Sequence, residues 1–248
     1  MTIVTVLSIP EGIILASDTQ TTIYQINASQ QPIPINDFKN AQKIFEISPE
    51  NGPVIAALSQ FGIANPAGKP LSSHIFSIRN ILKEELGNLT TVDSIADKII
   101  TYFRQFPNNE LVGLGFFLSG FDFEEGAYSA RVLFISFTIN KEKEFKVDKS
   151  ISIKKGTFTI AWAGEGGWII NKLLNLSDEA GKIPRASIPY NVLSLKDGVE
   201  LSHYFINTVI GFERFQSRYP QCGGKVKIAV LTPFKFKFLN VQEEELYI

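Results

Sequence analysis

The chain has 248 residues, enough to bury a full core as one domain over residues 1–248. Hydrophobic residues make up 44% and charged residues 20%, and the formal net charge is −1, which argues against nucleic acid or an anionic membrane surface as a partner. No apolar run reaches the roughly 18 residues that span a bilayer, and the start lacks the basic region and long apolar core of a signal peptide. The single Cys222 cannot form an internal disulfide, so we predict a cytoplasmic protein. With only two histidines, a histidine-rich metal site is excluded, and we predict no metal and no cofactor.

The first residues predict a β-hairpin. Two apolar runs, at 3–7 and 13–16, flank the sequence Ile9-Pro10-Glu11-Gly12, which favours a tight reversal of the chain. A hairpin brings the start of its first strand beside the end of its second strand. We therefore expect Thr2 and Asp18 to be neighbours in space.

Alternating apolar and polar residues predict further short strands up to residue 58, separated by Pro- and Gly-containing segments. We expect, in chain order, a strand at 21–25, a proline-punctuated surface loop or extended arm at 27–37, a strand at 43–47, a turn at 48–53 and a buried strand at 54–58.

Helices are predicted where apolar residues recur at helical spacing. One such stripe covers 72–86 and is ended by Gly87, and another follows the capping residue Thr91 to Phe103. The remaining segments are expected as strands at 111–121, 127–137, 145–153 and 157–163, a helix at 168–174, a loop at 178–189, a long helix capped by Ser194 and ending near Arg218, and closing strands at 225–231 and 235–239. This order predicts an α+β fold in which two packed sheets carry helices on both outer faces, a four-layer α-β-β-α sandwich.

Thr2 attracts attention because it is the second residue. Removal of Met1 would expose a free α-amine and a hydroxyl group on the same residue. An N-terminal threonine carries its own general base, since the amine can accept the hydroxyl proton directly or through one water. Small second residues generally permit removal of the initiator methionine, and the mechanism depends on it.

The opening resembles that of proteasome β subunits and of the bacterial HslV protease, which are N-terminal nucleophile (threonine) hydrolases. The resemblance rests on Thr2, Gly12, the triplet Ala16-Ser17-Asp18 and the polar segment Thr19-Gln20-Thr21-Thr22, aligned without a gap. It continues, with insertions before Lys43 and near the middle, at Lys43-Ile44, Phe117-Leu118-Ser119-Gly120-Phe121-Asp122, Ala163-Gly164-Glu165-Gly166-Gly167 and Cys222-Gly223-Gly224. The resemblance implies a proteasome-like sandwich and a threonine-type endopeptidase.

The same resemblance implies roles for individual residues. Thr2 would be the nucleophile, Lys43 the charged group beside it that holds down the pKa of its amine, and Asp18 the partner of Lys43. Lys39 is a rival for the lysine role because the insertion makes the alignment there ambiguous. The backbone N–H of Ala57 would stabilise the oxyanion, at the place where the family has a glycine.

Substrate side chains would meet Thr21, Phe45 and Ala57, which suggests a modest apolar pocket. Three features count against activity: a glutamate in place of a serine, two replacements around the late turn, and the need to remove Met1. Glu165 stands where the family has a serine, and a carboxylate there would raise the pKa of the Thr2 amine. Tyr219 and Cys222 stand where the family often has an aspartate and a serine.

Three functions therefore stay open at the level of sequence. The first is a threonine-type peptidase in a homo-oligomeric ring of six or seven subunits, single or stacked, which takes peptides or unfolded proteins, with an ATPase unfoldase as a candidate partner. The second is a catalytically silent ring or structural subunit, which Glu165, Ala57 and a retained Met1 would fit. The third is an N-terminal nucleophile amidase that acts on a small amide.

Overall fold

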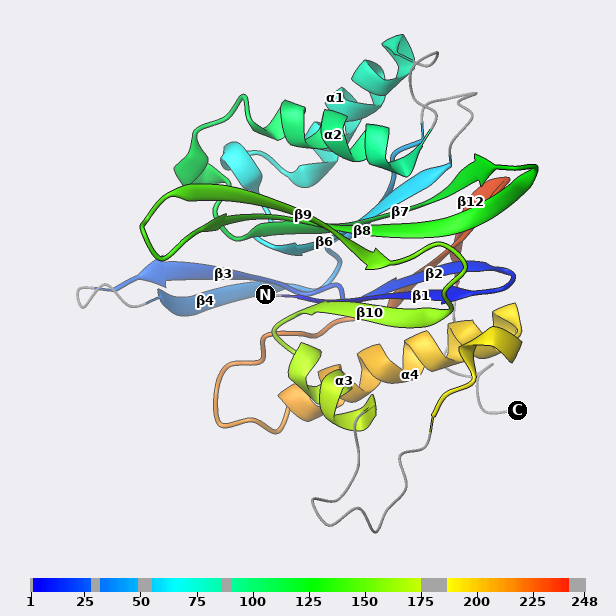
Figure 1. The fold of residues 1–248 in the computed structure, drawn as a ribbon. Helices are drawn as coiled ribbons and strands as arrows, with labels where there is room; N and C mark the ends of the chain where they lie inside the picture. The colour runs from blue at the N-terminus through cyan, green and yellow to red at the C-terminus, as the bar shows by residue number, and fades with distance from the viewer. Residues whose placement is uncertain (1, 28–31, 49–54, 86–90, 175–186, 241–248) are drawn as a thin grey trace.

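The computed structural model describes residues 2–27, 32–48, 55–85, 91–174 and 187–240 (Figure 1). Their strands form two five-stranded sheets and one two-stranded ribbon, and every pairing is antiparallel. The first sheet has the order β10 (Thr159–Gly164), β1 (Ile3–Ile9), β2 (Gly12–Ser17), β11 (Lys227–Thr232), β12 (Lys235–Leu239). The second sheet has the order β5 (Ile44–Glu46), β6 (Ala56–Gly62), β7 (Leu114–Glu124), β8 (Ala127–Ile139), β9 (Phe145–Ile153), and the ribbon pairs β3 (Thr21–Ile26) with β4 (Pro32–Phe38).

Helices cover the outer face of each sheet, and the two sheets face each other (Figure 1). The helices α1 (Leu71–Glu84) and α2 (Val92–Phe103) lie on the second sheet, and α3 (Gly167–Leu174) and α4 (Leu195–Glu213) lie on the first. Short 3-10 helices occur at Pro66–Gly68, Asn108–Glu110 and Tyr190–Val192. The expected order of mixed helices and strands in packed sheets is therefore observed in the described residues.

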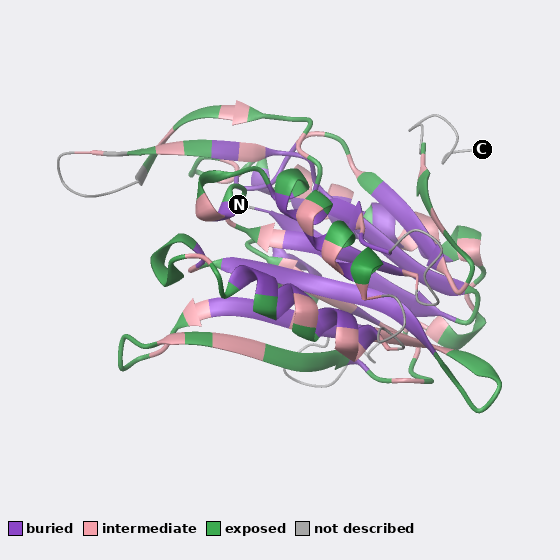
Figure 2. Ribbon diagram, turned by 90° about the horizontal axis from the view of Figure 1, so that it is seen from above, coloured by how far each residue is buried: buried purple, intermediate pink, exposed green. Residues whose placement is uncertain are grey.

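Three groups of buried apolar side chains fill the spaces between these elements. Strand β1 contributes to two of these groups, because successive side chains of a strand point to opposite faces of the sheet. Val4 and Val6 point between the sheets, whereas Ile3 and Leu7 point towards α3 and α4. Since both faces of β1 are covered, all its residues are buried, and all but Thr5 and Ser8 are apolar. Figure 2 accordingly shows the buried residues concentrated in the central strands and the exposed ones at the loop tips. Representative members are Val6, Leu15 and Phe117 between the sheets, Ile99, Phe103 and Phe116 beneath α1 and α2, and Leu7, Ile14 and Val209 beneath α3 and α4.

The stretch at 27–37 is predicted as a loop or an extended arm. Its second half forms most of strand β4, so the structure agrees better with an extended arm than with a loop. The β3–β4 ribbon projects from the body of the molecule (Figure 1). Prolines are tolerated at 32 and 34 because β4 is an edge strand. The hydroxyl of Tyr24 donates to Gln221 Oε1 (2.9 Å) and that of Tyr219 donates to Asp37 Oδ1 (3.1 Å), which ties the ribbon to the body.

Two predicted boundaries need correction. Strand β6 runs to Gly62, beyond the predicted end at residue 58. Helix α4 ends at Glu213, before the predicted Arg218, because the buried Glu213 carboxylate accepts hydrogen bonds from Arg218 Nη2 (2.7 Å) and from Gln221 N–H (3.0 Å) and so turns the chain back. Residues 49–53 of the predicted turn at 48–53 and most of the predicted loop at 178–189 lie outside the described residues.

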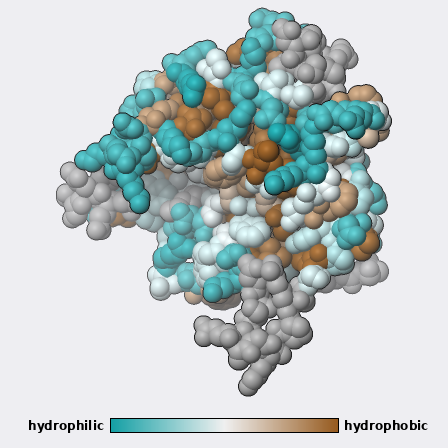
Figure 3. Space-filling view, viewed as in Figure 1, coloured by the Kyte–Doolittle hydropathy of each residue, from teal (hydrophilic) through white to brown (hydrophobic). Residues whose placement is uncertain are grey.

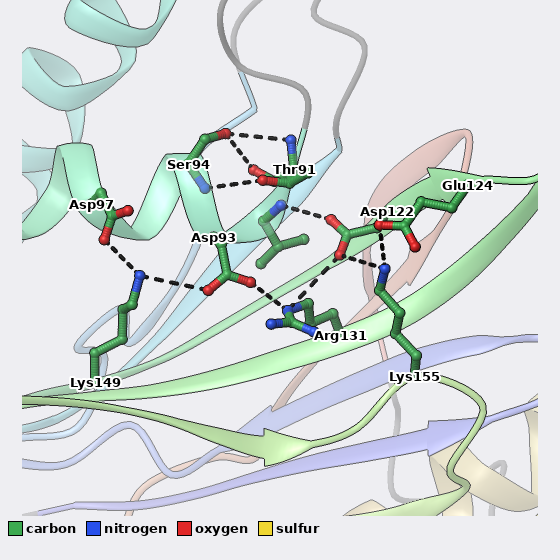
Figure 4. Close-up of polar contacts among 10 residues, drawn as sticks. Thr91, Asp93, Ser94, Asp97, Asp122, Glu124, Arg131, Lys149 and Lys155 are labelled. Atoms are coloured by element: carbon green, nitrogen blue, oxygen red, sulfur yellow. Dashed lines mark hydrogen bonds and ion pairs between the residues drawn. The ribbon is translucent and has the colours of Figure 1, made fainter.

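A network of charged side chains docks helix α2 onto the second sheet (Figure 4). Asp122 on β7 is buried, and its Oδ1 accepts a hydrogen bond from Val92 N–H at the start of α2 (2.7 Å). Its other oxygen lies 3.8 Å from Arg131 Nε and 3.6 Å from Lys155 Nζ. Thr91 caps the same helix, as predicted, by accepting a hydrogen bond from the backbone N–H of Ser94. The network therefore anchors the helix and lies apart from the site described below.

The exposed apolar residues on the face shown in Figure 3 form several separate patches among polar ones, so no single patch of described residues marks a contact surface there. Among the described helices, none is long and apolar enough to cross a membrane.

His74 makes the stability of the fold depend on pH. It is buried on α1, with Nδ1 2.9 Å from the Tyr102 hydroxyl and Nε2 2.9 Å from the Pro66 carbonyl oxygen. A carbonyl only accepts, so Nε2 carries a hydrogen, and in the neutral ring Nδ1 accepts from the Tyr102 hydroxyl. Burial is the main cause that lowers the pKa of His74 below its ordinary value of 6.5.

Because the unfolded chain binds this proton more readily than the folded one, the contribution of His74 is fully present above pH 6.5 and is lost as the pH falls below that value. We expect the free energy of unfolding of the wild type to fall more between pH 7.5 and pH 5.0 than that of His74→Gln, measured by urea titration. Identical pH dependence in both proteins would contradict this assignment.

Candidate active site

The amino-terminal hairpin brings Thr2 and Asp18 together, as the sequence predicts. Ile3, directly after Thr2, donates its backbone N–H to Asp18 Oδ1 (3.0 Å), and Asp18 N–H donates to the Ile3 carbonyl oxygen (3.2 Å). Thr2 itself is buried, with 6% of its surface exposed. The start of the chain is therefore attached by two hydrogen bonds to the end of the second strand.

Asp18 is a fully buried carboxylate whose two oxygens are both saturated. Oδ1 accepts from Ile3 N–H (3.0 Å) and from Lys43 Nζ (2.7 Å), and Oδ2 accepts from Gln20 N–H (3.2 Å) and from Gly223 N–H (3.1 Å). A buried charge is tolerated only when it is paired and hydrogen-bonded in this way. The four donors come from four separate segments of the chain, so Asp18 joins them at one point.

Lys43 is the lysine that the structure puts at this point. Its ammonium group donates to Asp18 Oδ1 (2.7 Å) and to the Gln20 carbonyl oxygen (2.6 Å), and its side chain is only 5% exposed. The rival Lys39 is 67% exposed and lies 3.9 Å from Asp37. Lys43, and not Lys39, therefore pairs with Asp18.

A cavity of about 700 Å³ opens beside these residues. Five of the residues predicted for the site line it together: Thr2, Thr21, Lys43, Phe45 and Glu165. Residues 60–65 and 70–72 form the opposite wall, which includes apolar side chains. The cavity therefore combines a hydroxyl group, charged groups and an apolar wall in one place.

The segment that follows β10 holds Thr2 from the other side. Glu165 donates its backbone N–H to the Thr2 carbonyl oxygen (3.1 Å). Gly164 has a φ of +111°, and a Cβ atom on it would lie 1.8 Å from the same oxygen. Only glycine fits so close an approach. The Gly-Glu-Gly segment singled out in the sequence thus positions the backbone of Thr2.

Ala57 is not brought to the cavity. It lies inside β6, opposite Glu46 on β5 and Ser119 on β7, and its side chain is fully buried between the sheets. The residue of β6 that lies across from Lys43 is Gln60, whose N–H donates to the Lys43 carbonyl oxygen (2.8 Å). The prediction of an oxyanion donor at Ala57 therefore has no support from the shape of the cavity.

Sequence reasoning missed the part of the wall that begins at Gln60. A Cβ atom on Gly62 would lie 1.7 Å from the Gly113 carbonyl oxygen, and both glycines have positive φ angles. Ile63 N–H also donates to that oxygen (3.2 Å), which fixes the wall to the loop before β7. The two glycines are visible in the sequence, but nothing local to either predicts that they meet.

The family pattern often has a serine where this chain has Cys222 and an aspartate where it has Tyr219. Neither Cys222 nor Tyr219 provides an equivalent side chain. Burial, and then the negative charge of Asp18, raise the pKa of the Cys222 thiol well above its ordinary value, so the thiol is neutral. The Tyr219 hydroxyl donates to Asp37 on the ribbon. Within the described part of the chain, no group of three or more His, Cys, Asp and Glu side chains is arranged to hold a metal ion.

Comparison with known proteins identifies a similar fold and gives no information on activity. No protein-family model and no curated protein matches the sequence. Among solved structures, the chain is similar to Anbu (ancestral beta-subunit) from Yersinia bercovieri, with a TM-score of 0.56 and 14% identity over 99% of this chain and 89% of that one. At this identity the likeness shows the fold alone. It agrees with the resemblance to proteasome β subunits that the sequence indicates.

The buried ion pair predicts a large effect on stability. Asp18→Ala leaves the Lys43 ammonium buried without its charged partner, so we expect the free energy of unfolding to fall by about 3–5 kcal/mol. Glu200→Ala, which removes an exposed partner 3.8 Å from Lys196, is the matched control and should change it by less than about 1 kcal/mol. Urea titration of both variants measures the difference. Equal losses would contradict a structural role for the Asp18–Lys43 pair.

Proposed function

We propose that this chain is a threonine-type peptidase subunit of a proteasome-like ring, which hydrolyses peptide bonds through Thr2 after removal of Met1. The proposal includes a single proteasome-like domain over residues 1–248 with the four-layer α-β-β-α sandwich of N-terminal nucleophile hydrolases. One observation carries it. Thr2 lines the same cavity as Lys43, whose charge is balanced by a buried aspartate that is also hydrogen-bonded to the residue after Thr2.

The first step is acylation. The Thr2 hydroxyl oxygen attacks the substrate carbonyl carbon while the α-amine of the same residue accepts the hydroxyl proton, directly or through one water. The positive charge of Lys43 favours the neutral form of that amine and stabilises negative charge in the transition state. The amine then passes the proton to the departing nitrogen, the peptide bond breaks, and an ester to Thr2 remains.

The second step is hydrolysis of that ester. Water attacks the ester carbonyl with the α-amine as general base, and the proton returns to the Thr2 oxygen as the acid product leaves. Asp18 takes no part in bond formation. It holds the Lys43 ammonium in place beside the reacting groups.

The cavity wall also suits an extended peptide. Strand β6 is paired with β7 as far as Gly62, whereas its other edge is bonded to the β5 segment only as far as Gln60. The cavity-facing edge at 61–62 therefore has no strand partner within the described residues. An extended chain beside such an edge gains main-chain hydrogen bonds. Thr21 and Phe45 face the same space, so we propose them as contacts to substrate side chains.

The proposal includes a homo-oligomeric ring of six or seven subunits, single or stacked. It also includes an ATPase unfoldase as a partner that would deliver unfolded proteins. The support for both is the fold shared with an ancestral β-subunit.

A silent ring subunit is the second candidate, and Glu165 is the observation that favours it. Glu165 lines the cavity together with Thr2, and a carboxylate there would favour the protonated, unreactive form of the Thr2 amine.

Replacement of the hydroxyl group tests the peptidase directly. We expect Thr2→Ala to lower the cleavage of short fluorogenic peptides at least about 1,000-fold, because no nucleophile remains. Thr2→Ser keeps a hydroxyl and should retain measurable cleavage. Thr138→Ala, on β8 and away from the cavity, is the matched control and should cleave like the wild type. Unchanged turnover in Thr2→Ala would refute the proposal.

A further inference from the structure

One charged residue that lines the cavity, Glu165, has no charged partner among the described residues. Of the described residues that line it, only Lys43 and Glu165 are charged. The Lys43 ammonium is paired with Asp18 at 2.7 Å and also donates to the Gln20 carbonyl oxygen. Glu165 has no such partner, because within the described part of the chain its side chain makes no hydrogen bond or ion pair. Of the two charged residues in the described lining, Glu165 is therefore the one whose charge is left without a partner.

The backbone of Glu165 is rigidly placed next to Thr2. Its N–H donates to the Thr2 carbonyl oxygen (3.1 Å), and Gly164 on one side accepts no side chain. On its other side, a Cβ atom on Gly166 would lie 2.1 Å from Val209, so this residue is packed directly against α4. The two flanking contacts hold the backbone of Glu165 at the cavity beside the nucleophile, and its side chain is exposed. A charged residue with its backbone fixed beside the nucleophile is within reach of the substrate side chains next to the reacting bond.

The rest of the cavity suits an aliphatic stem. Phe45, Phe61, Ile63 and Leu71 contribute apolar surface to its lining. Lysine and arginine side chains carry three or four methylene groups that pack on apolar surface while the charged end reaches a polar partner. A carboxylate pairs with an ammonium or a guanidinium through charge-assisted hydrogen bonds.

We propose that Glu165 is a specificity-determining residue that selects peptides with a lysine or arginine side chain next to the bond that is cleaved. The apolar lining receives the methylene groups, and the Glu165 carboxylate receives the cation. This inference rests on the proposed function of the same site. It gives a role to the residue that departs most clearly from the family pattern.

The test compares two peptides that differ only in charge. One carries lysine and the other norleucine, which has a similar aliphatic stem, at the positions on either side of the cleaved bond in turn. We expect kcat/KM of the assembled full-length wild type to be roughly 10- to 100-fold higher for the lysine peptide, the range of one hydrogen bond to a charged group. In Glu165→Gln the ratio should fall to near one. Glu11→Gln, in the exposed hairpin turn, is the matched control and should keep the wild-type ratio.

The outcomes separate the two proposals. Cleavage without a preference for lysine, or with the same preference in Glu165→Gln, overturns the inference and leaves the peptidase standing. If no peptide is cleaved, the peptidase fails, and fluorescence anisotropy of the same labelled peptides on Thr2→Ala then decides the inference. Tighter binding of the lysine peptide that disappears in the Thr2→Ala, Glu165→Gln double variant supports it, and equal binding of both peptides overturns it.

Discussion

The ion pair between Asp18 and Lys43 is the interaction on which the site depends. Taking both charges out of water is unfavourable by several kcal/mol per ion, so the pair exists only because four donors saturate the carboxylate and a carbonyl oxygen accepts from the ammonium. These partners belong to the first strand, the segment after the second strand, the segment before β5 and the turn before β11. The position of Thr2 is thus determined by contacts between parts of the chain that are far apart in sequence.

Much of the fold could be predicted because its signals are local. The Pro-Glu-Gly turn fixes the hairpin, and through it the meeting of Thr2 with Asp18 follows from strand geometry. The cap at Thr91 and the stripe after it place α2 correctly. The gathering of Thr21, Lys43, Phe45 and Glu165 around Thr2 was predicted by resemblance, and the structure brings these residues to one cavity.

The failures have a common physical cause, because each depends on contacts that no local pattern encodes. Ala57 stands where the family pattern has a glycine, but the register of β5 with β6 puts Gln60, and not Ala57, across from Lys43. The end of α4 is set by the buried Glu213 and by Arg218 and Gln221, which follow the helix. The wall at Gly62 exists because that residue meets Gly113, some fifty positions away.

Thr2 as an N-terminal nucleophile is tested most directly by the intact mass of the purified protein, before and after treatment with a threonine-reactive epoxyketone. A free α-amine and an adjacent hydroxyl are both needed for that reagent to form its adduct. We predict a mass that lacks Met1 and that rises by one inhibitor equivalent, and no adduct on Thr2→Ala. A mass that retains Met1 and does not change would contradict the mechanism and would favour a structural subunit with the same fold.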